Sequence, residues 1–145
     1  FHGIGIDISS KSISLSNRNA KKLSVENRVK FIKTDVDNFC IGKYDLIISN
    51  PPYIKTNDIK YLEKDVNNFE PKLALDGGLD GTYKTLKIVK KASSLLKVNG
   101  KLVLEIAYNQ RTKIINLLKK EGFYINSTIK DYAKNDRCMI STKII

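Results

Sequence analysis

The residues best suited to chemistry in this sequence are the four in Asn50-Pro-Pro-Tyr53. Asn50 has a side-chain carbonyl and Pro51 has a backbone carbonyl, and together the two can accept both hydrogens of a planar –NH2 group. Tyr53 adds an aromatic face on which a flat amide or a nucleobase can stack. The nitrogen of such a group is a poor nucleophile because its lone pair is delocalised, so aiming it at an electrophile is a large part of what a protein can contribute. Asn50, Pro51, Pro52 and Tyr53 are therefore our candidate catalytic and substrate-binding residues.

A short apolar run leads directly into these four residues and predicts a strand at residues 45–49. Leu46, Ile47 and Ile48 show no alternation with polar residues, which is typical of a strand buried on both faces. Proline disfavours a helical conformation in the residue before it, so Asn50 is predicted to be held extended at the carboxyl end of this strand. Ligands of open α/β sheets bind at that end. The competing interpretation is a strand that ends in an ordinary Pro-Pro turn.

Acidic residues follow two other predicted strands. Asp7 ends a strand at residues 3–8, and Asp35 follows a strand at residues 29–33, with a helix capped by Ser9 or Ser10 between them. This order predicts a nucleoside site, in which Asp7 binds ribose hydroxyls and Asp35 binds the adenine amino group. Acidic residues also close turns after strands, so the prediction depends on its combination with Asn50.

The rest of the chain alternates between predicted helices and strands. A long connection at residues 54–80 includes a short helix near 58–65, and a turn is expected at Asn99-Gly100. The remaining expected elements are a helix from residue 80 or 82 to 97, a strand at 101–107, a helix at 110–121 and strands at 123–130 and 138–144. The last two strands are joined by a short loop and should be antiparallel. At 145 residues the pattern predicts one α/β domain with a doubly wound sheet.

Composition narrows the class of protein. The formal net charge is +11, from 26 Lys and Arg against 15 Asp and Glu, which favours an anionic partner such as nucleic acid. Heavy use of Lys, Asn and Ile also fits the codon bias of an A/T-rich genome, and the lysines are scattered, so we favour this second interpretation. Cys40 and Cys138 stand far apart and His2 is the only histidine, so we expect no metal site, no disulfide and a reduced cytoplasmic setting. The sequence has no apolar run long enough to cross a membrane.

Longer motifs surround the four candidate residues. They are Asn50-Pro-Pro-Tyr-Ile54, Phe69-Glu-Pro-x-x-Ala-Leu-Asp-Gly-Gly-x-Asp-Gly81, Gly100-x-Leu-x-Leu-Glu-Ile106 with Gln110, and Asp131 with Asp136-Arg137. With these motifs the sequence resembles the peptide-chain-release-factor glutamine methyltransferases over essentially its whole length. The resemblance implies a class I methyltransferase fold, Rossmann-like, with an antiparallel pair of strands at the C-terminus.

The resemblance also implies an activity. Enzymes of this family transfer a methyl group from S-adenosylmethionine to the side-chain amide nitrogen of the glutamine in the Gly-Gly-Gln motif of peptide chain release factors. A release factor is therefore the expected protein partner. By matching position, Asn50 to Tyr53 would hold the glutamine. The cofactor-binding residues implied are Asp7, Ile8, Asp35, Val36 and Asn50.

Three features of the family have no counterpart in this sequence. They are the substrate-recruiting N-terminal helical domain, the first strand of the sheet, which in the family lies between the strands matching residues 3–8 and 45–49, and the glycine-rich loop after that strand. We therefore expect residues 1–145 to be a single catalytic domain that is truncated at its N-terminus. Two other interpretations stay open. One is an amino-methyltransferase acting on adenine N6 or guanine N2 of a nucleic acid, since the same four residues suit an extruded base. The other is a non-catalytic binding fragment.

Overall fold

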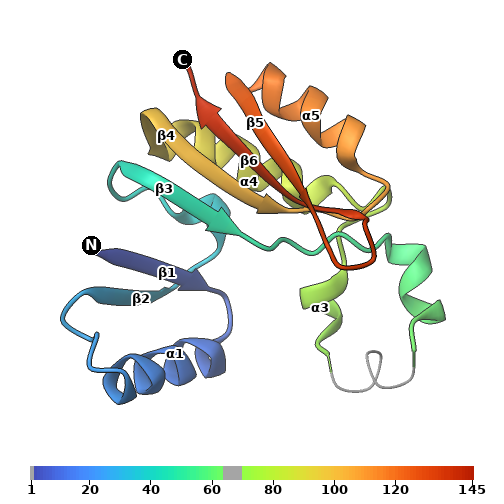
Figure 1. The fold of residues 1–145 in the computed structure, drawn as a ribbon. Helices are drawn as coiled ribbons and strands as arrows, with labels where there is room; N and C mark the ends of the chain where they lie inside the picture. Colours follow the sequence, from blue (N-terminus) through green and yellow to red (C-terminus); the bar gives the residue numbers. More distant parts are fainter. Residues whose placement is uncertain (1, 64–69) are drawn as a thin grey trace. The chain divides into compact units, whose positions relative to one another are not determined.

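The chain folds into two compact units, Phe1–Cys40 and Ile41–Ile145 (Figure 1). The structure is a computed structural model, and it describes residues 2–63 and 70–145. Among these residues each unit has its own sheet, with two strands in the first unit and four in the second.

The first unit is a strand–helix–strand motif, as the sequence predicts. Strands β1 (Gly3–Asp7) and β2 (Val29–Lys33) are parallel and in register from Gly3 opposite Val29 to Asp7 opposite Lys33. Helix α1 (Ser10–Lys22) connects them. Its N-cap is Ser9, whose side chain accepts a hydrogen bond from the backbone of Ser12 at 3.2 Å. Ala20 on α1 is buried.

The second unit contains a mixed sheet with the strand order β3-β4-β6-β5. Its strands are β3 (Tyr44–Ser49), β4 (Leu96–Glu105), β5 (Phe123–Lys130) and β6 (Asp136–Lys143). β3 and β4 are parallel, whereas β6 is antiparallel to both β4 and β5, which confirms the predicted antiparallel pair at the C-terminus. Helix α4 (Tyr83–Leu95) lies between β3 and β4 in the sequence, and α5 (Arg111–Lys120) lies between β4 and β5.

Three further short helical segments occur in the described part of the chain. They are the 3-10 helices η1 (Val36–Asn38) and η2 (Thr56–Tyr61) and the single-turn α3 (Lys72–Leu75). Where a helix is expected near residues 58–65, the structure has the 3-10 helix η2, which begins earlier. Residues 64 and 65 of the expected helix lie outside the described residues, as does Phe69 of the motif that ends at Gly81.

The prediction of a turn at Asn99-Gly100 is wrong, because β4 runs through these residues. The chain bulges there instead: Asn99 has a φ of 68°, and the pairing with β3 jumps from Tyr44 opposite Leu96 to Leu46 opposite Lys101. A bulge of this kind absorbs extra residues without ending the strand.

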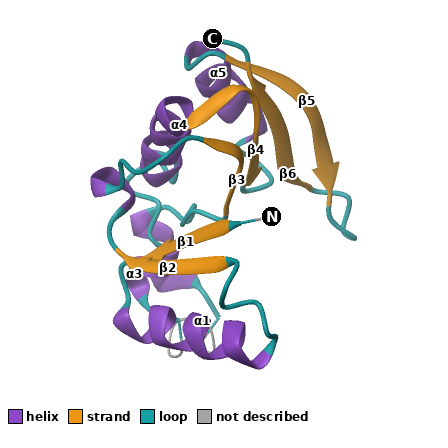
Figure 2. Cartoon of the chain, turned by 90° about the vertical axis from the view of Figure 1, so that its left-hand side faces the viewer, coloured by secondary structure: helices purple, strands orange, loops and turns teal. Residues whose placement is uncertain are grey.

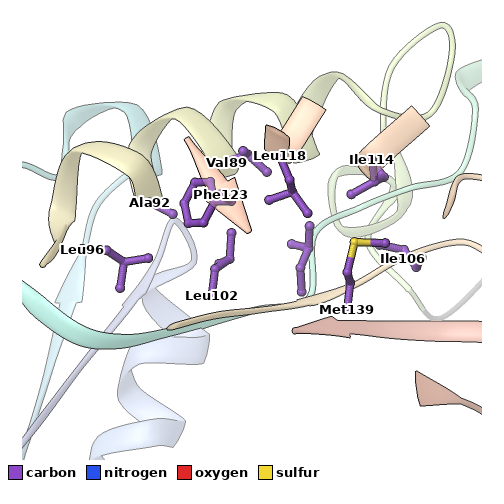
Figure 3. Close-up of a cluster of buried hydrophobic side chains, with 10 residues drawn as sticks. Val89, Ala92, Leu96, Leu102, Ile106, Ile114, Leu118, Phe123 and Met139 are labelled. Atoms are coloured by element: carbon purple, nitrogen blue, oxygen red, sulfur yellow. The ribbon is translucent and has the colours of Figure 1, made fainter. Parts of the chain in front are cut away.

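The core of the second unit lies between its sheet and helices α4 and α5, which cover the same face of the sheet (Figures 2 and 3). Leu102 and Leu104 alternate along β4 and point into this core, as expected for the inward side of a strand. The buried cluster comprises Val89, Ala92, Leu96, Leu102, Leu104, Ile106, Ile114, Leu118, Phe123 and Met139. In the part of the chain that the structure describes, no helix is long and apolar enough to cross a membrane.

We expect the substitution Leu104→Ala to lower the free energy of unfolding by about 2–5 kcal/mol, because it leaves a cavity at a fully buried position. Leu79→Ala is the matched control, since Leu79 is 82% exposed, and it should change stability by less than about 0.5 kcal/mol. Urea denaturation of both variants measures the difference. Equal losses of stability would show that this core is wrongly assigned.

The expectation that the strand at residues 45–49 is buried on both faces is wrong. Leu46 is 50% exposed and Ile48 is 70% exposed, whereas Ile47 between them packs against the core. The reason is that the helices of the core cover only the face to which Ile47 points. Among the described residues no further strand pairs with β3 or with β1, so each has a single partner.

Candidate functional site

Asn50 lies one residue beyond the end of β3, where the sequence predicts it. Its side chain is exposed, and within the described parts of the chain its amide makes no hydrogen bond. The next residue, Pro51, is buried. Asn50 therefore has a side-chain carbonyl that is available to a ligand, and the burial of Pro51 fixes the backbone next to it.

The segment after Asn50-Pro-Pro-Tyr53 is paired with the motif that ends in Ala-Leu-Asp-Gly-Gly-x-Asp-Gly81, which we call the second motif. The Ile54 N–H donates to the Leu75 carbonyl at 3.1 Å, and the Gly77 N–H donates to the Ile54 carbonyl at 2.8 Å. Ile54 and Asp76 form an isolated parallel bridge, and the Thr56 N–H donates to the Gly78 carbonyl at 3.1 Å. Two motifs that are separate in the sequence thus form one structure.

The carboxylate of Asp76 reinforces this pairing. Its Oδ1 accepts hydrogen bonds from the Thr56 hydroxyl at 2.7 Å and from the Gly78 N–H at 2.9 Å. These two bonds, led by that from Thr56, lower the pKa of Asp76. Asp76 is therefore ionised at neutral pH and links the two segments.

Glycines allow the segments to approach closely. A Cβ atom at Gly77 would lie 2.8 Å from the Cα of Tyr53 and 2.6 Å from the carbonyl oxygen of Gly81. Gly81 has a φ of 74°, and a Cβ there would lie 2.6 Å from the carbonyl oxygen of Tyr53. Both positions require glycine, because any side chain would push the second motif away from Tyr53.

Tyr53 is anchored at its hydroxyl group. The hydroxyl donates to Glu105 Oε1 at the end of β4, at a distance of 3.3 Å. Burial, and to a smaller extent the Glu105 charge, raise the pKa of Tyr53. The phenol is therefore protonated at neutral pH, and its ring has a fixed position on which a planar group can stack.

Gln110 anchors Tyr53 at its backbone. The Nε2 group of Gln110 donates to the carbonyls of Tyr53, at 3.2 Å, and of Gly81, at 3.0 Å. The residue is 8% exposed, and its Oε1 has no hydrogen-bond partner among the described residues. Glu105 and Gln110 occur in the motifs that carry the family resemblance, but their positions in the sequence give no indication that both reach Tyr53.

A second polar cluster fixes the loop between β5 and β6. Arg137 donates from Nε and Nη2 to Asp131 Oδ2, at 3.3 and 3.1 Å, and from Nη1 to the Ile106 carbonyl at 3.3 Å. The N–H groups and the arginine around Asp131 lower its pKa, with the bond from Asn135 contributing most. These motif residues therefore stabilise the end of the sheet beside Glu105.

In the first unit, Asp7 and Asp35 lie at the carboxyl ends of the two parallel strands. The Thr34 N–H donates to the Asp7 carbonyl at 3.0 Å, which places the residue before Asp35 against the end of β1. Asp7 Oδ1 accepts from the Ser9 N–H at 2.7 Å, and Asp35 Oδ1 accepts from the Asp37 N–H at 2.9 Å. Each carboxylate thus closes a local turn with one oxygen.

The other cofactor-binding candidates of this unit adjoin the two acids. Ile8 follows Asp7 and is exposed, and Val36 follows Asp35 as the first residue of η1 and is partly buried. Asn50 belongs to the other unit, and the prediction that it shares a pocket with Asp7 and Asp35 stays a prediction.

Known proteins resemble the whole chain. Residues 1–142 match the family described as "Methyltransferase domain". The release factor glutamine methyltransferase of Fusobacterium nucleatum is 40% identical over 146 residues, which cover 97% of this chain and 40% of that protein. The enzyme of the same name from Agrobacterium fabrum is 35% identical over 137 residues, which cover 94% of this chain and 47% of that protein. The chain thus spans about half the length of the curated relatives it matches.

Solved structures show the same fold. A ribosomal protein L11 methylase from Lactobacillus delbrueckii has a TM-score of 0.68 at 19% identity, covering 98% of this chain and 57% of that chain. A methyltransferase from Pyrococcus furiosus has a TM-score of 0.67 at 20% identity, covering 98% and 62%. These likenesses concern the fold alone, and they confirm the predicted class I methyltransferase architecture. The predicted resemblance to the release factor glutamine methyltransferases is also confirmed, and the chain belongs to the methyltransferase domain family.

Proposed function

We propose that this chain transfers a methyl group from S-adenosylmethionine to the side-chain amide nitrogen of the glutamine in the Gly-Gly-Gln motif of a peptide chain release factor. The observation that carries the proposal is the pairing of Ile54 to Thr56 with Leu75 to Gly78. That pairing joins the segment directly after Asn50-Pro-Pro-Tyr53 to the motif that ends at Gly81. Because release factors act in translation, the proposal includes a cytoplasmic location.

The family implies S-adenosylmethionine as the cofactor, and the acids of the first unit fit its nucleoside end. Asp7 and Asp35 lie at the same edge, and each uses one carboxylate oxygen for its own turn. The other oxygen of Asp7 can accept from ribose hydroxyls, and that of Asp35 can accept from the adenine amino group. Ile8 and Val36 supply apolar contacts beside them.

The substrate amide is oriented by the residues after β3. Asn50 Oδ1 and the Pro51 carbonyl accept its two N–H groups, and the Tyr53 ring lies against its plane. S-adenosylmethionine supplies an electrophilic methyl group on a positively charged sulfur. As the aligned nitrogen forms the new N–C bond, the S–C bond of the cofactor would break, S-adenosylhomocysteine would leave, and one amide proton would pass to solvent water. Alignment of this type can contribute about 7–11 kcal/mol to lowering a barrier, so it can account for most of the catalysis.

A panel of substrates tests the proposal. The protein is incubated with S-adenosylmethionine and a Gly-Gly-Gln peptide, a matched Gly-Gly-Glu peptide and an adenine-containing oligonucleotide, and methylation is followed by mass spectrometry. We expect methylation of the Gly-Gly-Gln peptide only, since the glutamate peptide lacks the amide nitrogen. Methylation of the oligonucleotide in preference to the peptide would support a nucleic-acid amino-methyltransferase and contradict the proposal.

We expect Asp7→Asn to weaken S-adenosylmethionine binding by about 10- to 100-fold, because a hydrogen bond to a charged group contributes about 1.5–3 kcal/mol. The asparagine carbonyl can still accept from the Ser9 N–H, so the local turn is preserved. Isothermal titration calorimetry measures the change. Glu26→Gln, at an exposed position of the same unit, is the charge-matched control and should bind normally. Equal affinities for the two variants would remove Asp7 from the cofactor site.

A further inference from the structure

Gln110 joins two segments that the proposed chemistry needs together. Its amide nitrogen uses both hydrogens, one for the Tyr53 carbonyl at 3.2 Å and one for the Gly81 carbonyl at 3.0 Å. Tyr53 ends the –NH2-binding segment, and Gly81 ends the second motif. The two donated bonds also fix the orientation of the amide, because its oxygen could not replace either donor.

This side chain has no role in starting its own helix. Gln110 is the N-cap residue of α5, but its side chain makes no capping hydrogen bond. Only its backbone carbonyl serves the helix, by accepting from the Ile114 N–H at 3.0 Å. A substitution of the side chain therefore changes the link between the segments and leaves the helix start intact.

The side chain is also a poor choice for stability alone. Its Oε1 is buried without a hydrogen-bond partner among the described residues. A buried acceptor with no partner destabilises a folded protein, whereas an apolar side chain of similar size at the same place would avoid that cost. The unpaired oxygen thus offsets what the two donated bonds contribute to the free energy of folding. The main effect of the side chain is then to position Tyr53 relative to Gly81.

The two anchors of the –NH2-binding segment lie at its two ends. Ser49 is held at the end of β3 by pairing with Leu104, and the Tyr53 carbonyl is held by Gln110. The two prolines between these anchors have a fixed φ, so the backbone between the anchors has little freedom to change its conformation. Fixing both ends therefore fixes the backbone of Asn50 and the carbonyl of Pro51.

We propose that Gln110 is a positioning residue for methyl transfer, which holds the backbone of Asn50 and the Pro51 carbonyl in place by fixing Tyr53 to Gly81. The inference rests on the proposed function for its reaction, the transfer of a methyl group to a planar –NH2 group. It does not depend on whether that group belongs to a glutamine, because a nucleobase –NH2 group would need the same two carbonyls.

The test compares Gln110→Leu with Asn116→Leu, an exposed position on the same helix. We expect Gln110→Leu to lower kcat by about 10- to 100-fold, since a shift of about 1 Å in a positioned group can reduce a rate by a hundredfold. KM for S-adenosylmethionine should change less than about twofold, because the bonds lost are on the substrate side. Hydrogen exchange at the Ile54 and Gly77 amides should become faster, while Asn116→Leu should leave all three quantities unchanged.

Two results would overturn the inference. The first is a kcat of Gln110→Leu within twofold of wild type, or unchanged exchange at Ile54 and Gly77. The second is a fall in the thermal midpoint so large that the variant is unfolded at the assay temperature, because Gln110 would then be a structural residue. If the wild-type protein methylates an adenine oligonucleotide and not the Gly-Gly-Gln peptide, the proposed function fails. The same comparison is then made with the oligonucleotide, so the two failures are distinguishable.

Discussion

Asn50→Ala is expected to reduce methyl transfer to a Gly-Gly-Gln peptide by at least about a hundredfold while weakening S-adenosylmethionine binding far less. The substrate amide loses one of its two acceptors, and leaving a polar group unpaired costs about 1–3 kcal/mol. Misalignment of the nitrogen adds to that loss, since a displacement of about 1 Å can cost a further hundredfold. Steady-state kinetics gives the rate, and calorimetry gives the affinity for the cofactor.

The control for this variant is Asn57→Ala, which removes an exposed asparagine from η2 in the same unit. It should retain wild-type turnover. Near-wild-type turnover by Asn50→Ala would remove Asn50 from the reaction. A parallel loss of turnover in both variants would instead attribute the effect to general damage of the second unit.

Gly77→Ala is expected to reduce methyl transfer by about a hundredfold through geometry alone. The added methyl group would lie 2.6 Å from the Gly81 carbonyl oxygen and 2.8 Å from the Tyr53 Cα, closer than van der Waals contact allows. Both neighbours are backbone atoms, so the second motif must move away from Tyr53. That shift also disturbs the hydrogen bond from the Gly77 N–H to the Ile54 carbonyl, so the free energy of unfolding should fall by about 1–3 kcal/mol.

Gly3→Ala provides the matched control, because the Cβ added there meets only Val29 at an ordinary 3.7 Å. It should keep both activity and stability. Kinetics and urea denaturation on the two variants decide the matter. If Gly77→Ala is as active as Gly3→Ala, the close pairing of the two motifs is not required for turnover.

Much of the fold follows from local patterns in the sequence. The strand at residues 29–33 agrees with its predicted bounds, and the strand at 3–8 and the helix after Ser9 agree to within a residue or two, because capping and apolar periodicity are local properties. The final antiparallel pair follows equally directly from two alternating runs and a short loop.

The burial of β3 could not be predicted in the same way. Leu46, Ile47 and Ile48 are equally apolar, and the sequence does not reveal which of them faces a helix. Burial depends on which face of the sheet the helices cover, and Leu46 and Ile48 point away from the face that α4 and α5 cover. The bulge at Asn99 was missed for a related reason: an Asn-Gly pair is typical of turns, but here the partner strand continues alongside it.

The candidate site was predicted only in part. Asn50 and Tyr53 were identified from their own chemistry and from the strand before them. The residues that hold Tyr53 were not, because Glu105 and Gln110 are more than 50 residues away and reach it only through the folded sheet. That Asp7 and Asp35 lie close together is predictable, because both follow parallel strands whose carboxyl ends meet at the same end of the sheet.

A crystal structure of the protein with S-adenosylhomocysteine and a Gly-Gly-Gln peptide tests the proposed substrate site directly. We expect the glutamine amide nitrogen to lie about 2.7–3.2 Å from both Asn50 Oδ1 and the Pro51 carbonyl oxygen, with the amide plane against the Tyr53 ring. A peptide whose glutamine amide binds away from Asn50, or is held by other groups while Asn50 faces solvent, would contradict this expectation.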